Sequence, residues 1–255
     1  MSRWESLVVV GDSFAEGVGD PLPDGTVRGW SDLTAIELAT RAPGFRYANL
    51  AVRGRRLDQI VAEQIPAATG MRPDLICFSA GGNDALRPGF DVNDLMARFD
   101  RAVGTLTEAG AEVVLFRFPD QSVRLPLPGL LRPRIIAMND AVSGLAGRHG
   151  AHVVDLFGDA AFGLPDLWCQ DRLHLSPSGH RRVADQILAT LGVAPVPESV
   201  RAGTVARRRR RDDARWAQSH LGPWLRRRLT GGSSGDGVGA KRPRLSPVTR
   251  HSLPQ

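Results

Sequence analysis

The sequence feature that most constrains the fold is the run LVVVGDSF at residues 7–14. Its consecutive aliphatic residues favour a strand buried on both faces, and Gly11 and Asp12 then break the run as a tight turn does. Ser13 is therefore predicted to lie at the carboxyl edge of a sheet, where open α/β sheets bind ligands. Taken alone, the stretch favours a plainer interpretation, a turn serine that hydrogen-bonds its own backbone.

Strand-like and helix-like segments alternate after this run. The predicted strands are 7–10, 45–52, 74–80, 112–119 and 151–158, and the predicted helices are 30–42, 55–70, 92–110, 135–150 and 178–192. Such alternation requires right-handed crossovers and gives a parallel sheet covered on both faces. The sequence therefore predicts an α/β fold, a doubly wound five-stranded parallel sheet with helices on both faces.

Charge divides the chain into two parts. Residues 201–255 contain 14 Lys+Arg against 3 Asp+Glu, which leaves 19 against 24 for residues 1–200 and a net charge of +11 against −5. We predict a folded domain at 1–194 and a basic, partly disordered C-terminal extension at 195–255 that contains arginine and tryptophan. The stretch APVPES at 194–199 is typical of a linker, and residues 231–247 are of low complexity.

Four interpretations of the extension are open. It is a solvated tail, or it binds an anionic membrane surface or nucleic acid weakly through its basic run. Alternatively, its residues 212–229 form a helix docked on the acidic domain, or it takes part in substrate binding.

Cysteine content and the N-terminal segment bear on the cellular compartment. Cys77 lies in an apolar strand and is expected to be a buried free thiol, and with Cys169 as the other cysteine no disulfide framework is implied. The apolar segment near the N-terminus is too short for a signal peptide, and no stretch approaches the ~18 apolar residues of a membrane span. We therefore expect a cytoplasmic protein.

Residues suited to acyl transfer follow the predicted strands. A serine hydroxyl such as that of Ser13 needs an adjacent base, and His174 supplies an imidazole that Asp171, three residues earlier, can orient. A tetrahedral oxyanion needs preorganised donors, which the amide of Asn83 and the backbone N–H groups of Ser13 and Gly54 can provide. Because the carboxyl ends of parallel strands meet at one edge, these loops are expected to converge.

The blocks GDSF (11–14), Gly54, GND (82–84) and DRLH (171–174) resemble, in order and spacing, those of the SGNH (GDSL) hydrolase family of serine esterases and lipases. The resemblance spans residues 7 to about 192, with Phe14 standing where the motif name has leucine. It implies a flavodoxin-like sheet and hydrolysis of carboxylic esters through an acyl-serine intermediate.

The resemblance also implies individual roles. Ser13 becomes the nucleophile and an oxyanion donor, and Gly54 and Asn83 complete the oxyanion hole. Asp171 and His174 complete the triad. The partner is then a small-molecule acyl ester, with no cofactor and no metal. Nothing in the sequence selects among acyl lipids, acetylated carbohydrates and thioesters.

Other motifs are weaker. Asp12 and Asp84 invite a Mg²⁺ site, but a role in ordering the loops explains both. The GxSxG match at 231–235 follows no predicted strand and is rejected as a nucleophile elbow. The leucine-rich loop 122–133 is expected either to line an acyl pocket or to cover the sheet edge.

Two tryptophans also lie near the predicted site. Trp30 and Trp168 are expected to stack on a sugar or to wall off an acyl group. The alternative function is a noncatalytic scaffold that binds membrane or nucleic acid through its tail, and the intact Ser, Gly, Asn, Asp and His set argues against it.

Overall fold

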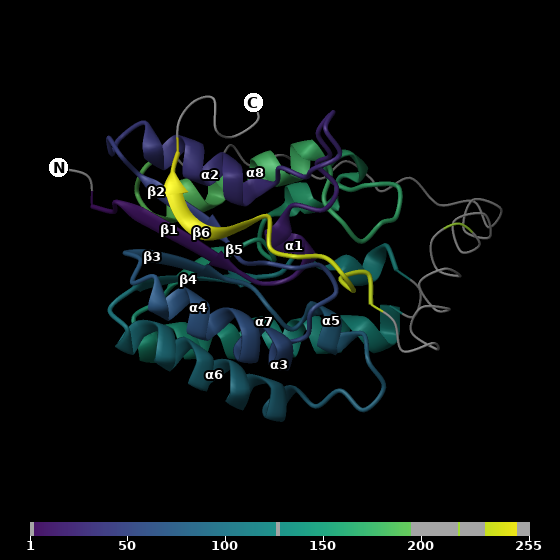
Figure 1. The fold of residues 1–255 in the computed structure, drawn as a ribbon. Helices are drawn as coiled ribbons and strands as arrows, with labels where there is room; N and C mark the ends of the chain where they lie inside the picture. The colour runs from purple at the N-terminus through teal and green to yellow at the C-terminus, as the bar shows by residue number, and fades with distance from the viewer. Residues whose placement is uncertain (1–2, 126–127, 195–218, 220–232, 249–255) are drawn as a thin grey trace.

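The computed structural model describes residues 3–125, 128–194, 219 and 233–248. Its six strands are β1 (Ser6–Val10), β2 (Arg46–Asn49), β3 (Leu75–Phe78), β4 (Glu112–Arg117), β5 (His152–Asp155) and β6 (Arg242–Pro247), in the order β5-β4-β3-β1-β2-β6 (Figure 1). β1 to β5 are parallel, which confirms the predicted five-stranded doubly wound sheet. Their order is that of flavodoxin-like sheets.

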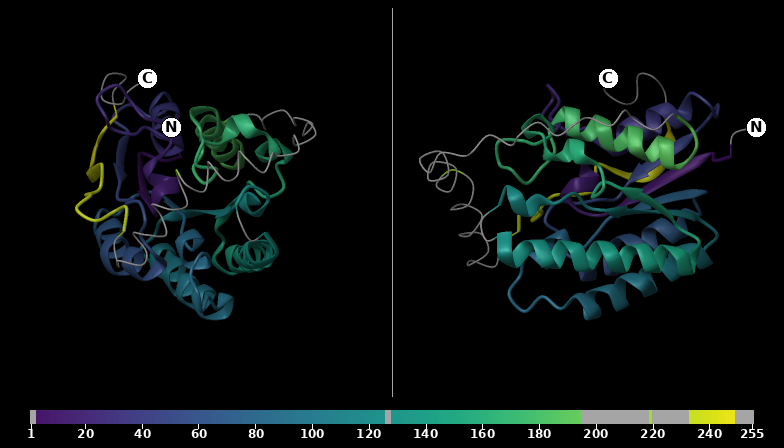
Figure 2. Two further views of the ribbon diagram at one scale, coloured as in Figure 1. Left: turned by 90° about the vertical axis from the view of Figure 1, so that its right-hand side faces the viewer. Right: turned by 180° about the vertical axis from the view of Figure 1, so that it is seen from behind.

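Helices cover both faces of the sheet (Figures 1 and 2). α2 (Trp30–Ala39) and α8 (Pro177–Thr190) lie on one face. The other face carries α3 (Leu57–Gln59), the π-helical turn η1 (Ile60–Gln64), α4 (Ile65–Gly70), α6 (Val92–Glu108) and α7 (Pro128–His149). Shorter turns follow the strands: α1 (Ser13–Glu16), α5 (Gly82–Ala85) and the 3₁₀ turns Gln121–Val123, Ala160–Gly163 and Pro165–Leu167.

The strand β1 is buried along its whole length and divides the core. Leu7 and Val9 pack with α2 and α8, whereas Val8 and Val10 pack with the helices of the opposite face. This alternation follows from the pleat of a strand, whose successive side chains point to opposite faces. An unbroken aliphatic run is therefore needed at this position, since both sides of the strand are covered.

The leucine-rich segment 122–133 differs from its prediction as a loop. α7 begins at Pro128, so the second half of the segment is helical. Proline is favoured at the start of a helix because its fixed φ is already helical and its missing N–H would have no partner there. The segment therefore carries helical side chains toward the carboxyl edge of the sheet.

The sixth strand was not predicted. β6 pairs antiparallel with β2 within the stretch assigned to the low-complexity part of the extension, and the N–H of Val248 donates to the carbonyl of Phe45 at 2.8 Å. Pro243 and Pro247 argue against a strand in the sequence, because proline has no N–H to donate to a neighbouring strand. Proline is tolerated on an edge strand, where some backbone groups need no partner strand. The predicted helix at 212–229 and the basic run before it lie outside the described residues, apart from residue 219.

Lys241 anchors this returning segment beneath the N-terminal turn of α2. Its ammonium donates to the carboxylate of Asp32 and to the carbonyls of Val27 and Arg28, so all three of its protons have acceptors. The Asp32 side chain is only 4% exposed and that of Lys241 16% exposed. Burial raises the pKa of Asp32 and lowers that of Lys241, while their mutual attraction opposes both shifts.

No helix in the described ranges is both long and apolar enough to span a membrane.

Replacing Lys241 with methionine is expected to lower the free energy of unfolding by about 3 kcal/mol, because the variant leaves Asp32 charged and buried without its cation. Urea unfolding of Lys241→Met, Asp32→Asn and the double variant measures this. We expect the double variant to be less destabilised than the sum of the single variants. Arg244→Met, at an exposed position of the same strand, serves as the control. Additive effects of the two substitutions would contradict the pairing.

Candidate active site

Ser13 is the first residue of α1, directly beyond the end of β1. Asp12 caps this helical turn by accepting a hydrogen bond from the N–H of Phe14 at 3.1 Å. The preceding Gly11 is held on both sides by Gln64, whose amide accepts from its N–H at 2.7 Å and donates to its carbonyl at 3.0 Å. The end of β1, and with it the position of Ser13, is thus fixed by a buried side chain from η1.

Asp171 and His174 lie in the loop that precedes α8. An antiparallel bridge between Trp168 and Leu175 closes this loop, and Ser176 then caps α8 by accepting from the N–H of Gly179. The Oδ2 atom of Asp171 lies 2.5 Å from Nδ1 of His174. Its Oδ1 atom accepts from the backbone N–H groups of Leu173 and His174, both at 3.0 Å.

The contacts of Asp171 keep it ionised. Burial acts to raise its pKa, but the hydrogen bond and charge of His174 together with the two backbone donors outweigh burial and lower the pKa to about 2. An ionised Asp171 accepts a hydrogen bond from the Nδ1–H group of His174, and a neutral ring that carries its proton on Nδ1 has an unprotonated Nε2. This is the tautomer that a general base requires.

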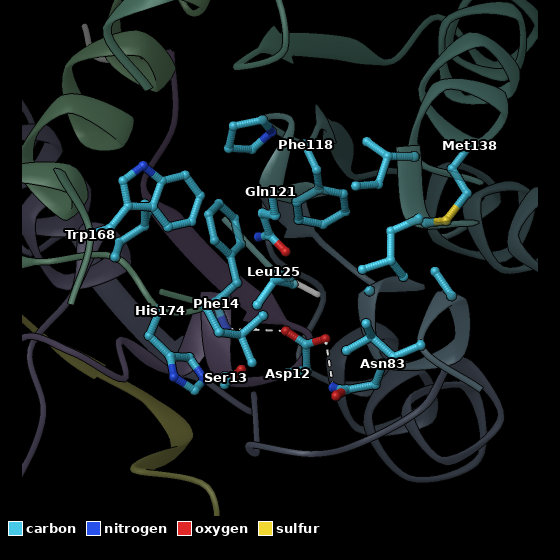
Figure 3. Close-up of a pocket in the computed structure, with 18 of the residues that line it drawn as sticks. Asp12, Ser13, Phe14, Asn83, Phe118, Gln121, Leu125, Met138, Trp168 and His174 are labelled. Atoms are coloured by element: carbon cyan, nitrogen blue, oxygen red, sulfur yellow. Dashed lines mark hydrogen bonds between the residues drawn. The ribbon is translucent and has the colours of Figure 1, made fainter. Parts of the chain in front are cut away.

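Ser13 and His174 line the same pocket, and Figure 3 shows the imidazole beside the serine. In the described part of the chain the Ser13 hydroxyl makes no hydrogen bond. Catalytic hydrogen bonds of this kind are often long without substrate and shorten in the complex. The structure thus brings the predicted nucleophile and base together, with Asp171 behind the base.

Asn83 lines the pocket from α5, opposite His174. Its side-chain amide donates to Oδ2 of Asp12 at 3.1 Å and to the carbonyl of Arg55 at 3.0 Å. Both amide protons therefore have acceptors in the free protein. The neighbouring Asp84 accepts from the N–H of Leu57 at 3.1 Å. The two residues of α5 thus tie down the loop that follows β2.

Asp12 is a buried carboxyl group, 6% exposed. Burial raises its pKa to about 6, against the lowering effects of the Phe14 N–H, His174 and Asn83. The sequence suggested a loop-ordering role for Asp12, and its bonds to Phe14 and Asn83 have that effect.

Gly54 lies in a tight turn, residues 52–55, in which the N–H of Arg55 donates to the carbonyl of Val52. Its φ of +77° at the third position, with no positive φ at Arg53, makes this a type II turn, which favours glycine there. Gly54 does not line the pocket that contains Ser13. It is connected to the pocket through Arg55, whose carbonyl accepts from Asn83.

A buried ion pair holds the same turn against α1. Glu16, 3% exposed, accepts from the backbone N–H of Arg53 at 2.6 Å and from its guanidinium at 2.5 to 3.1 Å. Sequence reasoning missed this pair and Gln64, because Glu16 and Arg53 are 37 residues apart and each is an ordinary surface residue by type. Two features of the sequence could have indicated the pair: Glu16 lies three residues after Ser13, and Gly54 lies in the basic stretch RGRR at 53–56.

The walls of the pocket are mostly apolar (Figure 3). They come from the loop after β4, from α7 and from the loop of the histidine, and include Phe118, Leu125, Leu131, Ile135, Met138 and Trp168. The leucine-rich segment thus lines the pocket, as one of its two interpretations held. Trp168 lines it too, but Trp30 is fully buried in the core against Phe14 and Phe116, so its predicted substrate contact is wrong.

The other histidines and cysteines of the described residues have structural contacts. His180 is fully buried, accepts from the N–H of Trp30 and donates to the carbonyl of Val18, and burial lowers its pKa to about 4. His149 pairs with Asp100, and Cys77 is a buried free thiol. Within the described ranges no three His, Cys, Asp or Glu side chains gather in a way that would hold a metal ion.

The structure thus combines a flavodoxin-like α/β fold with a serine, a histidine and an aspartate at the carboxyl edge of its sheet. Residues 9–182 match the GDSL-like Lipase/Acylhydrolase family. The chain therefore belongs to this family and is a carboxylic ester hydrolase.

Individual relatives agree with the family. The chain is 26% identical over 195 residues to Esterase TesA of Pseudomonas aeruginosa, covering 73% of this chain and 88% of the relative. The crystal structure of TesA is similar with a TM-score of 0.61 at 25% identity, over 73% of this chain and 97% of that one. Axe2, an acetylxylan esterase from Geobacillus stearothermophilus, has the same fold with a TM-score of 0.60 at 18% identity, over 78% and 97%.

The raised pKa of Asp12 predicts a specific pH dependence of stability. Because the folded state keeps the proton up to about pH 6 while the unfolded state loses it near pH 4, stability falls as pH rises between these values, by up to about 3 kcal/mol. Asp12→Ser retains a capping oxygen for Phe14 but does not titrate. Urea unfolding from pH 4 to 8 should therefore show a flatter profile for the variant, and parallel profiles would refute the shift.

Proposed function

We propose that the chain hydrolyses carboxylic esters through an acyl-serine intermediate on Ser13, with His174 as general base and Asp171 as its orienting partner. The observation that carries this proposal is the short contact of Asp171 with Nδ1 of His174, on a histidine that shares a pocket with Ser13. That contact leaves Nε2 available to accept the serine proton.

The first step forms a bond between the Ser13 oxygen and the ester carbonyl carbon, while the serine proton passes to His174. The imidazolium is stabilised by the ionised Asp171. As the tetrahedral adduct collapses, the bond to the alkoxide leaving group breaks and His174 returns the proton to that group. Water then attacks the acyl-serine in the same way, which releases the acid and restores Ser13.

The oxyanion of each adduct is assigned to the N–H groups of Ser13 and Gly54 and to the amide of Asn83. Neither of these two backbone N–H groups donates a hydrogen bond within the described residues, so both are available. Of the two protons of Asn83, the one donated to Arg55 keeps the turn in place. In the free protein the other proton is donated to the carboxylate of Asp12. We assign this proton to the oxyanion, so that the Asn83 amide exchanges one anionic acceptor for another when the adduct forms.

The substrate is proposed to be an ester with an apolar acyl group. The support is the pocket wall beyond Ser13, where Leu125, Leu131, Ile135 and Met138 present hydrocarbon to any group bound there. Asn139, a polar residue of the same wall, already exchanges two hydrogen bonds with the backbone of Phe118. It is therefore committed to holding that loop and is poorly placed to recognise a sugar hydroxyl.

Removing the nucleophile or the orienting carboxylate tests the mechanism. Ser13→Ala is expected to abolish hydrolysis of p-nitrophenyl esters. Asp171→Asn keeps an acceptor for the backbone donors of the loop but presents an N–H to His174, which selects the wrong tautomer and should lower kcat by about 10³- to 10⁴-fold. Asp166→Asn, an exposed neighbour, should match the wild type. Wild-type turnover by Ser13→Ala would refute the mechanism.

Chain-length preference tests the acyl pocket. Ile135 faces the pocket, whereas Ile136 faces a separate shallow groove with Pro133 and Asp140, so the adjacent positions provide a matched pair. Ile135→Phe should displace about two methylenes of a bound chain and lower kcat/KM for octanoate relative to acetate by about tenfold. Ile136→Phe should leave the ratio unchanged. An equal effect of both substitutions would argue against acyl binding here.

A further inference from the structure

The returning segment Ser233–Gly235 packs directly against the turn that contains Gly54. A Cβ atom placed on Gly54 would lie 2.3 Å from Oγ of Ser233 and 2.9 Å from Oγ of Ser234. A Cβ atom on Gly235 would lie 2.1 Å from the carbonyl oxygen of Arg53. The absence of side chains at both glycines therefore allows two backbones, far apart in sequence, to meet.

The carbonyl of Arg53 points at Gly235. The position of a Cβ on Gly235 is 2.1 Å from the oxygen and 3.3 Å from the carbon of this carbonyl, a difference close to the ~1.23 Å length of the C=O bond itself. The bond is therefore aligned with the returning segment. In a trans peptide the N–H of the next residue points the opposite way, so the N–H of Gly54 is directed away from this segment.

This peptide is the central one of the turn at 52–55. Type I and type II turns differ mainly by a rotation of the central peptide, which reverses the direction of its N–H. The other contacts of the turn act at its ends: Glu16 binds the N–H of Arg53, and Asn83 binds the carbonyl of Arg55. The packing of Gly235 acts on the central peptide itself.

The returning segment is itself a closed turn. The N–H of Ser233 donates to the carboxylate of Asp236 at 2.7 Å, the N–H of Asp236 returns a bond to the carbonyl of Ser233, and the N–H of Gly235 donates to Oγ of Ser233. Gly235 is buried, although Ser234 and Asp236 beside it are exposed. Beyond the turn, Lys241 and β6 fasten the segment to the domain.

We infer that Gly235 is a positioning residue for ester hydrolysis, which holds the Arg53–Gly54 peptide so that the N–H of Gly54 serves the oxyanion. This inference rests on the proposed function, because it assigns the N–H of Gly54 to the oxyanion hole. It gives a role to the last glycine of the serine-containing motif at 231–235, whose first two residues lie outside the described residues.

The test is the kinetics of Gly235→Ala in the full-length chain. The added methyl group must displace the carbonyl of Arg53 and with it the N–H of Gly54. Because loss of one oxyanion donor costs ~10² to 10³ in turnover, kcat for p-nitrophenyl butyrate should fall by about tenfold or more. KM should change less than about twofold. Inhibition by butylboronic acid, which forms a tetrahedral serine adduct, should weaken by a similar factor. Gly239→Ala, in the same segment with open space around it, is the matched control.

Asp236→Ala is the second variant, since it adds no volume and loosens the turn by removing the acceptor of the Ser233 N–H. Asp236→Ala should lower kcat by a smaller factor than Gly235→Ala and leave Tm unchanged. If Gly235→Ala does not fold, the kcat of Asp236→Ala tests the positioning role instead. Wild-type kcat in folded Gly235→Ala, or in Asp236→Ala when the first variant is unfolded, would overturn the positioning role. Retained activity in Ser13→Ala, measured alongside, would instead overturn the proposed function.

Discussion

The structure depends on the burial of β1 on both faces. The strand lies between β2 and β3 with helices above and below it, which favours the aliphatic run from Leu7 to Val10, while the buried Ser6 at its start donates a hydrogen bond to Asp74. The strand ends at Val10, and the chain turns at Gly11 and Asp12, which are still buried, before Ser13 becomes partly exposed. Ser13 therefore lies at the carboxyl edge of the sheet, just after the end of β1. The side-chain amide of Gln64 holds Gly11, the residue after the strand, through two hydrogen bonds.

Buried carboxylates organise the rim around that serine. Glu16 binds Arg53, Asp20 binds Arg28 and Asp32 binds Lys241, each acid being 5% exposed or less at its side chain. A buried charge without a partner is costly, so each pair ties together segments that the loops alone would leave independent. Asp12 differs from these acids because its hydrogen-bond partners are neutral donors, Asn83 and the backbone. Burial raises its pKa to about 6 in spite of these bonds.

The parallel sheet and the convergence of Ser13, Asn83 and His174 on one pocket were predictable, because both follow from local patterns. Apolar runs end in small polar residues, and parallel strands bring those ends to one edge. The closeness of Asp171 to His174 follows from a spacing of three residues in one loop. Glu16 with Arg53 and Lys241 with Asp32 could not be foreseen, since each pair joins distant segments and charge alone does not identify a partner. Trp30 was misassigned because nearness in sequence to a rim loop does not distinguish a pocket wall from the core.

The sixth strand shows why composition is a poor guide to the limits of a fold. Residues 231–247 are rich in glycine, serine and proline, a composition that is typical of segments without regular structure. In the described part of this stretch, however, individual glycines and prolines suit particular positions of the fold. Gly235 is needed where two backbones meet, and Pro243 and Pro247 are acceptable on the outermost strand of the sheet. An edge strand that pairs with β2 on one side needs few apolar residues of its own, because the β2 backbone supplies its hydrogen bonds and Lys241 supplies its anchor. A segment with so little burial of its own is therefore held by specific contacts, and those contacts end at the turn that carries Gly54.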